Sequence, residues 1–452
     1  MFVINNYLKM TLLACLLSSV LCAADKMQAV QHDSISAYAI NSRTHEVLLD
    51  EQSDLSLVPA SCMKVVTTAA ALQVLGPDMR FQTDLEYDGS IDAAGVLHGN
   101  LYIRGGGDPC LGSGRVLPAL AWPQQIEAWV AAIVKQGIRS IEGTIIGDAT
   151  RWESALAAPS WLWEDLGNYY GAGASALSFN ENAYTLFFKP GSKEGAEATI
   201  LRQEPPLATV KLVNEVKTGP LYSGDKACIY GAEYSPVQFI RGTIPLGVKE
   251  FAIKGAMSDP AASCADLLTK ALESRGGVVG RAPMRNQQPR VVFHTTLSPP
   301  VKDIVYWTNQ KSINLYAEHL LKKMGEVAKQ EGSTQAGTQA VTAFWAGQGI
   351  DLQGFYMADG SGLSRKNCIT AKQLVAILLK MKESPHFALF LKSLPEKRNY
   401  KAKHGSMSQI RGLTGYIDDT VFAVLINHST DSKLEERIDA ILAAATKPGN
   451  KQ

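Results

Sequence analysis

The alternation of apolar and polar positions divides the chain into a mixed start, a strand-rich middle and a helical second half. Between residues 35 and 40 small and large side chains alternate, and a short apolar run follows at residues 47–49. This spacing predicts a two-strand hairpin. An apolar stretch with helical periodicity then covers residues 59–75 and stops at Gly76-Pro77, so we expect a helix there.

From about residue 78 the pattern changes to short apolar runs separated by Gly, Pro and Asp turns, which is typical of strands. We expect these strands at residues 85–87, 100–103, 144–146, 183–188, 208–213 and 291–296, with helices at residues 124–137 and 259–276. Apolar spacing of about 3.6 residues then returns and predicts further helices. These helices cover residues 309–324, 334–348, 370–381 and 434–445, and two closing strands cover residues 405–410 and 421–427.

The simplest architecture is an α/β domain built from both ends of the chain and interrupted by a large, mainly β insertion. The α/β domain would comprise residues 24–77 and 296–452. One inserted domain would comprise residues 78–150 and 257–295, and a second would comprise residues 151–256. The insertion therefore leaves the α/β domain at the end of its first helix.

The composition indicates a globular protein with an ample core, since 46% of the 452 residues are apolar and 19% are charged. The net charge of +1 gives no indication of a nucleic-acid-binding surface, so we expect no nucleic-acid partner. Beyond the first 25 residues, no apolar run is long enough to cross a bilayer.

The first residues have the pattern of a targeting segment. Lys9 precedes a short apolar segment at residues 10–21, and the small residues Cys22-Ala23-Ala24 follow. This order predicts a secretory signal peptide over residues 1–23. A membrane anchor is the alternative, and peripheral association with a membrane stays open. Five cysteines remain after this segment with no Cys-x-x-Cys, so we expect no metal, no cofactor and at most two disulfides.

The strongest chemical signal lies at residues 59–66. Ser61 and Lys64 are three positions apart at the start of the predicted helix, so they share one helical face about one turn apart. A partly desolvated lysine has a lowered pKa, and its neutral amine can take the proton of the serine hydroxyl. A second Ser-x-x-Lys, at residues 223–226, lies in a Gly/Asp turn without helical periodicity and lacks this setting.

Two further polar groups follow in the second half of the chain. Ser312 and Asn314 lie near a predicted helix start, where both residue types commonly cap helices, so N-capping is one interpretation. Lys403 precedes Gly405 at the start of a predicted strand. A glycine there lets a ligand backbone lie along the strand, and the lysine could hold a carboxylate. An ordinary charged strand start is the alternative.

Ser-x-x-Lys, Ser-x-Asn and Lys-x-Gly in this order are the signature of penicillin-recognising serine acyltransferases. Ser61 and Ser312 are 251 positions apart, which is far more than a compact β-lactamase needs. The chain thus resembles the D-alanyl-D-alanine carboxypeptidase/endopeptidase family, the class C low-molecular-mass penicillin-binding proteins (peptidase family S13). Further segments fit the family pattern: LYIRGGGDP at 101–109, IGD at 146–148, WLWEDLGNYYGA at 161–172, DGSGLSR at 359–365 and LTGY at 413–416.

The resemblance implies a penicillin-binding/β-lactamase-like transpeptidase domain, with a large mainly β insertion between the first and second active-site motifs. It implies a serine-type carboxypeptidase and endopeptidase, exported to the periplasm, that acts on peptidoglycan peptides ending in D-Ala-D-Ala. It also implies reaction with β-lactam antibiotics. The oligomeric state stays open.

The resemblance gives a role to each motif residue. Ser61 attacks the peptide carbonyl and forms an acyl-enzyme, and Lys64 is its general base. Ser312, with Lys64 or Lys403, passes the proton to the leaving amine, while Asn314 holds the substrate amide. Lys403 attracts the terminal carboxylate.

Further roles are implied around these motifs. Backbone N–H groups of Ser61 and Ser406 would form the oxyanion hole. His404 and Ser406, on either side of Gly405, would donate hydrogen bonds to the terminal carboxylate. Asp148, in the insertion, matches an acidic position of the family that faces a cationic group on the peptide stem.

Two features depart from the family pattern. His404 replaces the threonine usually found between Lys and Gly, and only seven residues separate Pro395 from Lys403, where the family has a longer segment. Because histidine titrates near neutral pH, we expect the substrate KM to rise between about pH 6 and 8 if His404 binds the carboxylate. The departures leave two alternatives, a catalytically impaired peptidoglycan-binding relative and a β-lactamase or esterase on the same scaffold.

Overall fold

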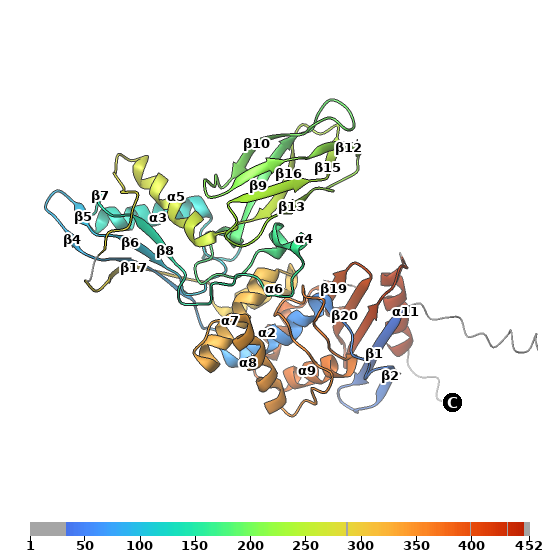
Figure 1. The fold of residues 1–452 in the computed structure, drawn as a ribbon. Helices are drawn as coiled ribbons and strands as arrows, with labels where there is room; N and C mark the ends of the chain where they lie inside the picture. The colour runs from blue at the N-terminus through green and yellow to red at the C-terminus, as the bar shows by residue number, and fades with distance from the viewer. Residues whose placement is uncertain (1–32, 286–287, 398, 432, 447–452) are drawn as a thin grey trace, which may run out of the picture.

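The computed structural model describes residues 33–446, apart from 286–287, 398 and 432. The predicted signal peptide, residues 1–23, lies outside this described part. The chain forms three lobes, which we name by their sheets (Figure 1). The six-strand lobe contains most of the helices, and the four-strand lobe and the β lobe rise from it on separate sides.

Both ends of the chain contribute to the six-stranded sheet, whose order is β18-β19-β20-β21-β1-β2. β1 pairs antiparallel with β21 along its whole length, from Ser34 opposite Asn427 to Asn41 opposite Thr420. The predicted hairpin over residues 35–49 is confirmed as β1 and β2. The strands are β1 (Ser34–Asn41), β2 (Val47–Glu51), β18 (Glu396–Lys397), β19 (Tyr400–Met407), β20 (Ile410–Ile417) and β21 (Thr420–Asn427).

Helices cover both faces of this sheet (Figure 1). Successive side chains of a strand point to opposite faces. In β21, Val421 and Ala423 belong to the core that contains α2, whereas Phe422 and Val424 belong to the core under α11. The helices of this lobe are α2 (Met63–Val74), α6 (Val301–Gln310), α7 (Asn314–Lys329), α8 (Thr334–Gly347), α9 (Ala371–Glu383), α10 (Phe387–Ser393) and α11 (Leu434–Thr446).

The helix predicted over residues 309–324 is confirmed from Asn314 onward as α7, but its predicted start is wrong, because two helices meet there. α6 ends at Gln310 and α7 begins at Asn314. Between them Ser312 has a φ of 55°, in the left-handed region that residues with a side chain rarely adopt. Apolar periodicity does not reveal such a break, since the helices on either side bury the same kinds of side chain.

Two other boundaries differ from the prediction. Residues 405–410 span the turn between β19 and β20, so three strands close the sheet instead of two. The first helix does not start at Pro59, because Ala60–Cys62 form a 3-10 turn, η1, and α2 starts at Met63. Ser61 therefore lies in this tight turn just before α2.

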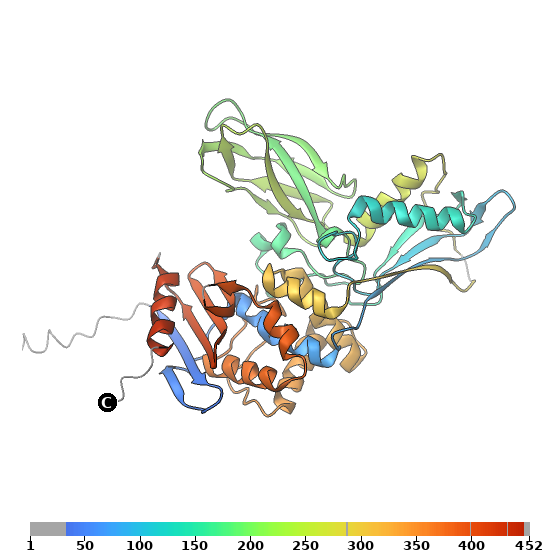
Figure 2. The same ribbon diagram turned by 180° about the vertical axis from the view of Figure 1, so that it is seen from behind.

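The four-strand lobe has a sheet of order β17-β3-β6-β8. Its core includes Leu85 and Ile103 from the sheet, Trp129 from α3 and Leu268 from α5. Seen from behind, α3 runs along the face of this lobe (Figure 2). The elements are β3 (Gln82–Tyr87), β4 (Ser90–Ile91), β5 (Val96–His98), β6 (Leu101–Arg104), α3 (Trp122–Lys135), β7 (Ser140–Ile141), β8 (Ile145–Asp148), α5 (Pro260–Glu273) and β17 (Val291–Leu297).

The β lobe is built from three small sheets around a core that includes Tyr184, Phe188 and Ile240. A short helix, α4 (Trp163–Leu166), lies between this lobe and the six-strand lobe (Figure 1). The strands are β9 (Ala183–Lys189), β10 (Thr199–Glu204), β11 (Lys211–Asn214), β12 (Lys217–Leu221), β13 (Cys228–Tyr230), β14 (Val237–Arg241), β15 (Thr243–Leu246) and β16 (Phe251–Ala256).

Helix α7 connects the six-strand lobe to the inserted segments through buried polar side chains. His319 Nδ1 donates to the Gly107 carbonyl at 2.8 Å, and its Nε2 lies 2.9 Å from Ser178 Oγ. Lys322 Nζ donates to the carbonyl oxygens of Ala155 and Ala174 at 2.6 and 3.0 Å. Because unpaired buried polar groups are costly, these bonds fix the insertion against α7.

Candidate active site

Ser61 and Lys64 form a hydrogen-bonded pair at the start of the first helix. Ser61 lies in η1, Lys64 lies in the first turn of α2, and 2.9 Å separate Ser61 Oγ from Lys64 Nζ. The predicted three-residue spacing therefore brings the two groups together. The Lys64 side chain is fully buried.

Lys64 Nζ makes two further short contacts, both with oxygen acceptors. One is the Asn314 side-chain oxygen at 2.6 Å, and the other is the Ser361 carbonyl at 2.7 Å. Burial lowers the pKa of Lys64 well below its usual value, and the charge of Lys403 lowers it further. A neutral amine has two N–H groups and one lone pair. With its hydrogens on Asn314 and Ser361, the lone pair is directed to the Ser61 hydroxyl.

The Ser361 carbonyl is held by buried acids on neighbouring segments. The Glu318 carboxylate accepts the N–H groups of Ser361 and Gly360 at 2.7 and 3.1 Å. Asp359 accepts the N–H of Gly362 at 2.7 Å. Burial and the nearby Asp359 raise the pKa of Glu318 to about 7. These bonds fix the loop that supplies one of the acceptors of Lys64.

Ser312 and Asn314 come from the break between α6 and α7. The residue before α7 is Ile313, and no side chain caps this helix end, so the N-capping interpretation is wrong. Asn314 Oδ1 accepts from Lys64, and its Nδ2 donates to the Tyr170 carbonyl at 2.8 Å. Asn314 therefore joins the Ser61 pair to a loop of the insertion.

The third motif lies on β19, which packs against η1. Lys403 is buried, its Nζ donates to the His404 carbonyl at 2.7 Å, and burial lowers its pKa to about 8. A Cβ at Gly405 would lie 2.4 Å from the Pro59 carbonyl oxygen, which is closer than real Cβ contacts come. Glycine at this position thus allows β19 to approach the turn that carries Ser61.

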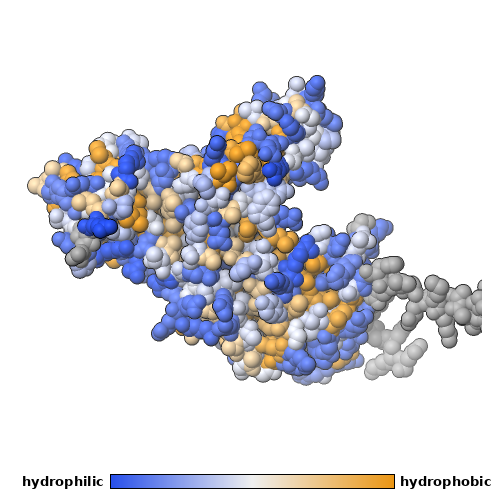
Figure 3. All heavy atoms as spheres, viewed as in Figure 1, coloured by the Kyte–Doolittle hydropathy of each residue, from blue (hydrophilic) through white to orange (hydrophobic). Residues whose placement is uncertain are grey.

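Four of the predicted site residues share one cleft, of about 350 Å³, where the surface is hollowed between the β lobe and the six-strand lobe (Figure 3). They are Ser61, Ser312, Asn314 and Ser406. Lys64 and Lys403 are buried beside it. The cleft is lined by Ser61, Leu162, Glu164, Asp165, Tyr170, Ser312, Asn314, Gly362, Leu363, Arg365, Ser406, Met407 and Ser408.

His404 and Asp148 do not line this cleft. The His404 ring lies 6.2 Å from that of Tyr400, and burial, then Lys403 and Lys397, lower its pKa. Asp148 Oδ2 lies 2.5 Å from Arg290 Nη1 in an ion pair on the four-strand lobe. Burial raises the pKa of Asp148, but hydrogen bonds from Thr150 and Arg290 outweigh it and hold this pKa below its usual value.

Glu164, Asp165 and Arg365 line the cleft but were not singled out from the sequence as site residues. Their segments, residues 161–172 and 359–365, fit the family pattern, which is the one feature of the sequence that points to them. Their chemistry depends on tertiary packing that places α4 opposite β19. These three charged side chains give the cleft a polar rim next to Ser61.

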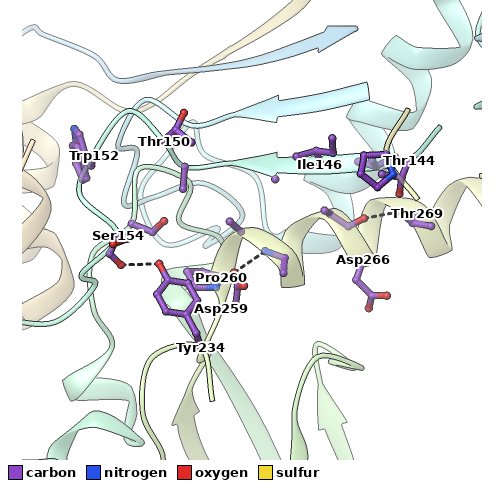
Figure 4. Close-up of a pocket in the computed structure, with 18 of the residues that line it drawn as sticks. Thr144, Ile146, Thr150, Trp152, Ser154, Tyr234, Asp259, Pro260, Asp266 and Thr269 are labelled. Carbon is purple, nitrogen blue, oxygen red and sulfur yellow. Dashed lines mark hydrogen bonds between the residues drawn. The ribbon is translucent and has the colours of Figure 1, made fainter. Parts of the chain in front are cut away.

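A larger cavity, of about 860 Å³, lies between β8 and α5 (Figure 4). Thr150, Trp152 and Asp259 are among its lining residues. Tyr234 donates from its hydroxyl to the Ser154 carbonyl at 2.7 Å across this cavity. None of the motif serines or lysines lines it, so it lacks the nucleophile and base of the Ser61 cleft.

Among the described residues, no cluster of three or more His, Cys, Asp or Glu side chains could hold a metal ion. The cysteines at 62, 110, 228, 264 and 368 are all unpaired. No helix in the described part of the chain is long and apolar enough to cross a membrane.

The family model of the D-Ala-D-Ala carboxypeptidase 3 (S13) family matches residues 21–447. The chain belongs to this family. It is a serine-type D-Ala-D-Ala carboxypeptidase, a hydrolase of peptidoglycan. The family resemblance found in the sequence is thereby confirmed.

Two curated relatives cover most of this S13 chain. It is 28% identical over 412 residues to a D-alanyl-D-alanine carboxypeptidase of Actinomadura sp. (strain R39), covering 84% of this chain and 74% of the relative. It is 25% identical over 435 residues to the D-alanyl-D-alanine carboxypeptidase DacB of Haemophilus influenzae, covering 89% and 87%.

The fold is also shared with a solved structure. The crystal structure of penicillin binding protein 4 (dacB) from Haemophilus influenzae matches with a TM-score of 0.76 at 22% identity, covering 92% of this chain and 95% of that one. This likeness confirms the predicted α/β penicillin-binding fold of the S13 carboxypeptidase.

Proposed function

We propose that this chain is a periplasmic D-Ala-D-Ala carboxypeptidase and endopeptidase that works through an acyl-enzyme on Ser61 and is inhibited by penicillin. The observation that carries the proposal is the 2.9 Å hydrogen bond between Ser61 Oγ and the buried Lys64 Nζ. A neutral amine in this place can take the hydroxyl proton as the oxygen attacks the substrate.

The reaction has two steps. The Ser61 oxygen bonds to the carbonyl carbon of the scissile peptide while its proton passes to Lys64. The C–N bond then breaks, and Ser312 relays a proton to the leaving amine. In the second step a water oxygen bonds to the ester carbon, the bond to Ser61 breaks, and Ser61 regains a proton. Ser312 lines the same cleft as Ser61, which supports its role as the relay.

Substrate binding uses groups around the same cleft. Asn314 Nδ2 uses one N–H on the Tyr170 carbonyl, and its second N–H is available to a substrate amide. Backbone N–H groups of Ser61 and Ser406 form the oxyanion hole, where each donor contributes about 3 to 4 kcal/mol. Lys403 attracts the terminal carboxylate, and Ser406, which lines the cleft, donates a hydrogen bond to it.

We assign contact with a cationic group on the peptide stem to Glu164 and Asp165 in place of Asp148. Asp148 is engaged by Arg290 and Thr150 and does not line the cleft. Glu164 and Asp165 line it and make no ion pair with any described residue. Their charge suits an amine on the substrate.

We also propose that the predicted domains, residues 24–77 and 296–452 for the catalytic domain, hold with one boundary moved past Leu297, where β17 of the four-strand sheet ends. The two inserted domains divide as predicted at residues 150–151 and 256–257. The pairing of β1 with β21 and of β3 with β17 supports this division, because each sheet joins segments distant in the sequence.

The intact mass of the mature protein, measured before and after a penicillin, tests the proposal. We expect a stable one-to-one adduct that maps to Ser61, none with Ser61→Ala in a folded protein, and D-alanine release from a D-Ala-D-Ala peptide. Absence of both adduct and release in the folded parent would favour the peptidoglycan-binding relative. Rapid penicillin turnover would favour a β-lactamase.

A further inference from the structure

A second cavity adjoins the Ser61 cleft on the other side of the Ser-x-Asn motif. Tyr170, Ser312 and Asn314 line both. We call it the basic cavity. It has a volume of about 390 Å³ and is lined by Arg115, Tyr169, Tyr170, Glu181, Ala183, Lys254, Lys311, Ser312, Ile313, Asn314 and Leu315.

Two lysines give this cavity its charge. Lys254 on β16 and Lys311 after α6 are exposed, and neither forms an ion pair with any residue that the structure describes. The other two charged residues neutralise one another, since Arg115 Nε and Nη2 lie 2.6 and 2.9 Å from the two oxygens of Glu181. The cavity therefore carries two uncompensated positive charges.

The Ser61 cleft has the opposite balance at its surface. Its charged lining residues are the carboxylates Glu164 and Asp165 and the guanidinium of Arg365. The hydrogen bond between Asn314 and the Tyr170 carbonyl lies at the boundary between the two hollows. A substrate that extends past Ser312 thus passes from an acidic region to a basic one.

The two cleavages of a peptidoglycan hydrolase differ only in what leaves. A carboxypeptidase releases D-alanine, whose α-carbon carries a methyl group. An endopeptidase releases a whole stem peptide. Its leaving nitrogen belongs to a diamino acid, and the carbon next to that nitrogen carries the rest of the peptide, with further carboxylates. In both cases the leaving nitrogen takes its proton at Ser312, which lines the basic cavity. Of the two leaving groups, only the stem peptide of a cross-link continues beyond the amino acid that carries the leaving nitrogen.

We propose that the basic cavity receives the anionic leaving strand of a cross-linked substrate, with Lys254 and Lys311 as the residues that favour endopeptidase activity. This inference rests on the proposed function of the Ser61 cleft. Because both lysines are exposed, the attraction is screened by salt, and each contact contributes modestly. This attraction changes the preference of the enzyme between the two substrates and leaves the chemistry at Ser61 unchanged.

The test compares two substrates with the full mature protein. One is a stem peptide ending in D-Ala-D-Ala, and the other is a soluble dimer of stem peptides cross-linked through diaminopimelate. In Lys254→Glu/Lys311→Glu we expect the ratio of cross-link cleavage to D-alanine release to fall by roughly tenfold at low salt. The fall should shrink at high salt, and Lys254→Arg should keep the ratio of the parent.

Lys193→Glu/Lys226→Glu is the matched control, because these lysines are exposed on the β lobe and line neither hollow. This control should keep the ratio of the parent. Penicillin adduct formation at Ser61 shows whether each variant is folded. A variant that fails to fold is replaced by Lys254→Glu alone.

The outcomes separate the two proposals. An equal fall in both activities, an unchanged ratio, or the same fall in the control overturns the role of the basic cavity. A parent that releases D-alanine but cleaves no cross-link also overturns it, while the carboxypeptidase stands. A parent with no D-alanine release and no adduct overturns the proposed function, and this inference with it.

Discussion

Asn314 Oδ1 lies 2.6 Å from Lys64 Nζ, so an amide from the second motif contacts the amine of the first. Asn314→Asp places a carboxylate at this distance. A nearby negative charge favours the ammonium form, so the pKa of Lys64 should rise. Since only the neutral amine acts as base, the rise of the penicillin acylation rate with pH should move to higher pH.

Asn314→Ala is the control for this change, because it removes the acceptor without adding charge. It should slow acylation without a comparable shift of the profile to alkaline pH. If Asn314→Asp and the parent reach half of their maximal acylation rates at the same pH, the assignment of Lys64 as the base is refuted.

Gly405→Ala should disturb the site by steric overlap. The new Cβ would lie 2.4 Å from the Pro59 carbonyl oxygen and 3.1 Å from the Cys62 nitrogen, both of them backbone atoms. β19 and η1 must then separate, and overpacking of this kind typically costs about 1 to 3 kcal/mol. We expect the acylation rate constant to fall about tenfold or more, as measured by stopped-flow with a fluorescent penicillin.

Gly347→Ala provides the comparison for the glycine substitution. A Cβ at Gly347, in the last turn of α8, meets no atom within 4 Å. Acylation by this variant should match the parent. Equal rates for Gly405→Ala and Gly347→Ala would show that the contact between β19 and η1 does not limit the reaction.

Protonation of His404 should alter the substrate KM only at a pH lower than the range of 6 to 8 expected from the sequence. Burial and the charges of Lys403 and Lys397 lower its pKa below the usual value of 6.5, so the imidazole is neutral at pH 7 and above. The ratio of KM between the parent and His404→Thr should therefore stay constant from pH 7 to 9. A ratio that changes within this range would show that His404 titrates there.

His319 should make the protein less stable in acid. Burial lowers its pKa to about 3, against 6.5 for the free side chain. Between these values the unfolded chain binds a proton that the folded protein does not, so stability is full above about pH 6.5 and falls as pH decreases. One such proton changes the free energy of unfolding by about 1.4 kcal/mol per pH unit.

Chemical denaturation of the parent and His319→Gln between pH 5 and 6.5 measures this effect. The glutamine cannot take up the proton. The free energy of unfolding of His319→Gln should therefore change less steeply with pH, by the equivalent of about one bound proton. Other titrating groups are common to both proteins and cancel in the comparison. Parallel slopes would show that His319 stays neutral in the unfolded state as well, or is protonated in both.

The sequence predicted the Ser61–Lys64 pair because two residues three positions apart in a helical segment lie close together whatever the rest of the fold. It could not predict that Ser312 has a left-handed conformation, since this break depends on how α6 and α7 pack. The expected strand from residue 405 missed the start of β19 at Tyr400. With the correct strand, side-chain alternation places His404 on the face of Tyr400 and Ala402, which belong to the core under α11, and Lys403 on the opposite face.

Other parts of the site depend on contacts between distant segments. The sequence pattern around Asp148 predicts a substrate contact, but Arg290, 142 positions later, occupies its carboxylate. Glu164 and Asp165 gain their place in the cleft only through the docking of α4 beside the six-strand lobe. The identity of a single residue does not show which partner its side chain will meet, whereas the tertiary structure does.

Helix α7 begins at Asn314, in the cleft, and carries His319 and Lys322 in its next turns, where they bind carbonyl groups of the insertion. The insertion is consequently not an exchangeable module. A chimera that grafts the lobes of one relative onto another would leave His319 and Lys322 facing foreign loops unless α7 is transferred as well. Natural sequence drift in the lobes should be restricted in the same way near Gly107 and Ala174, and freer at their outer tips.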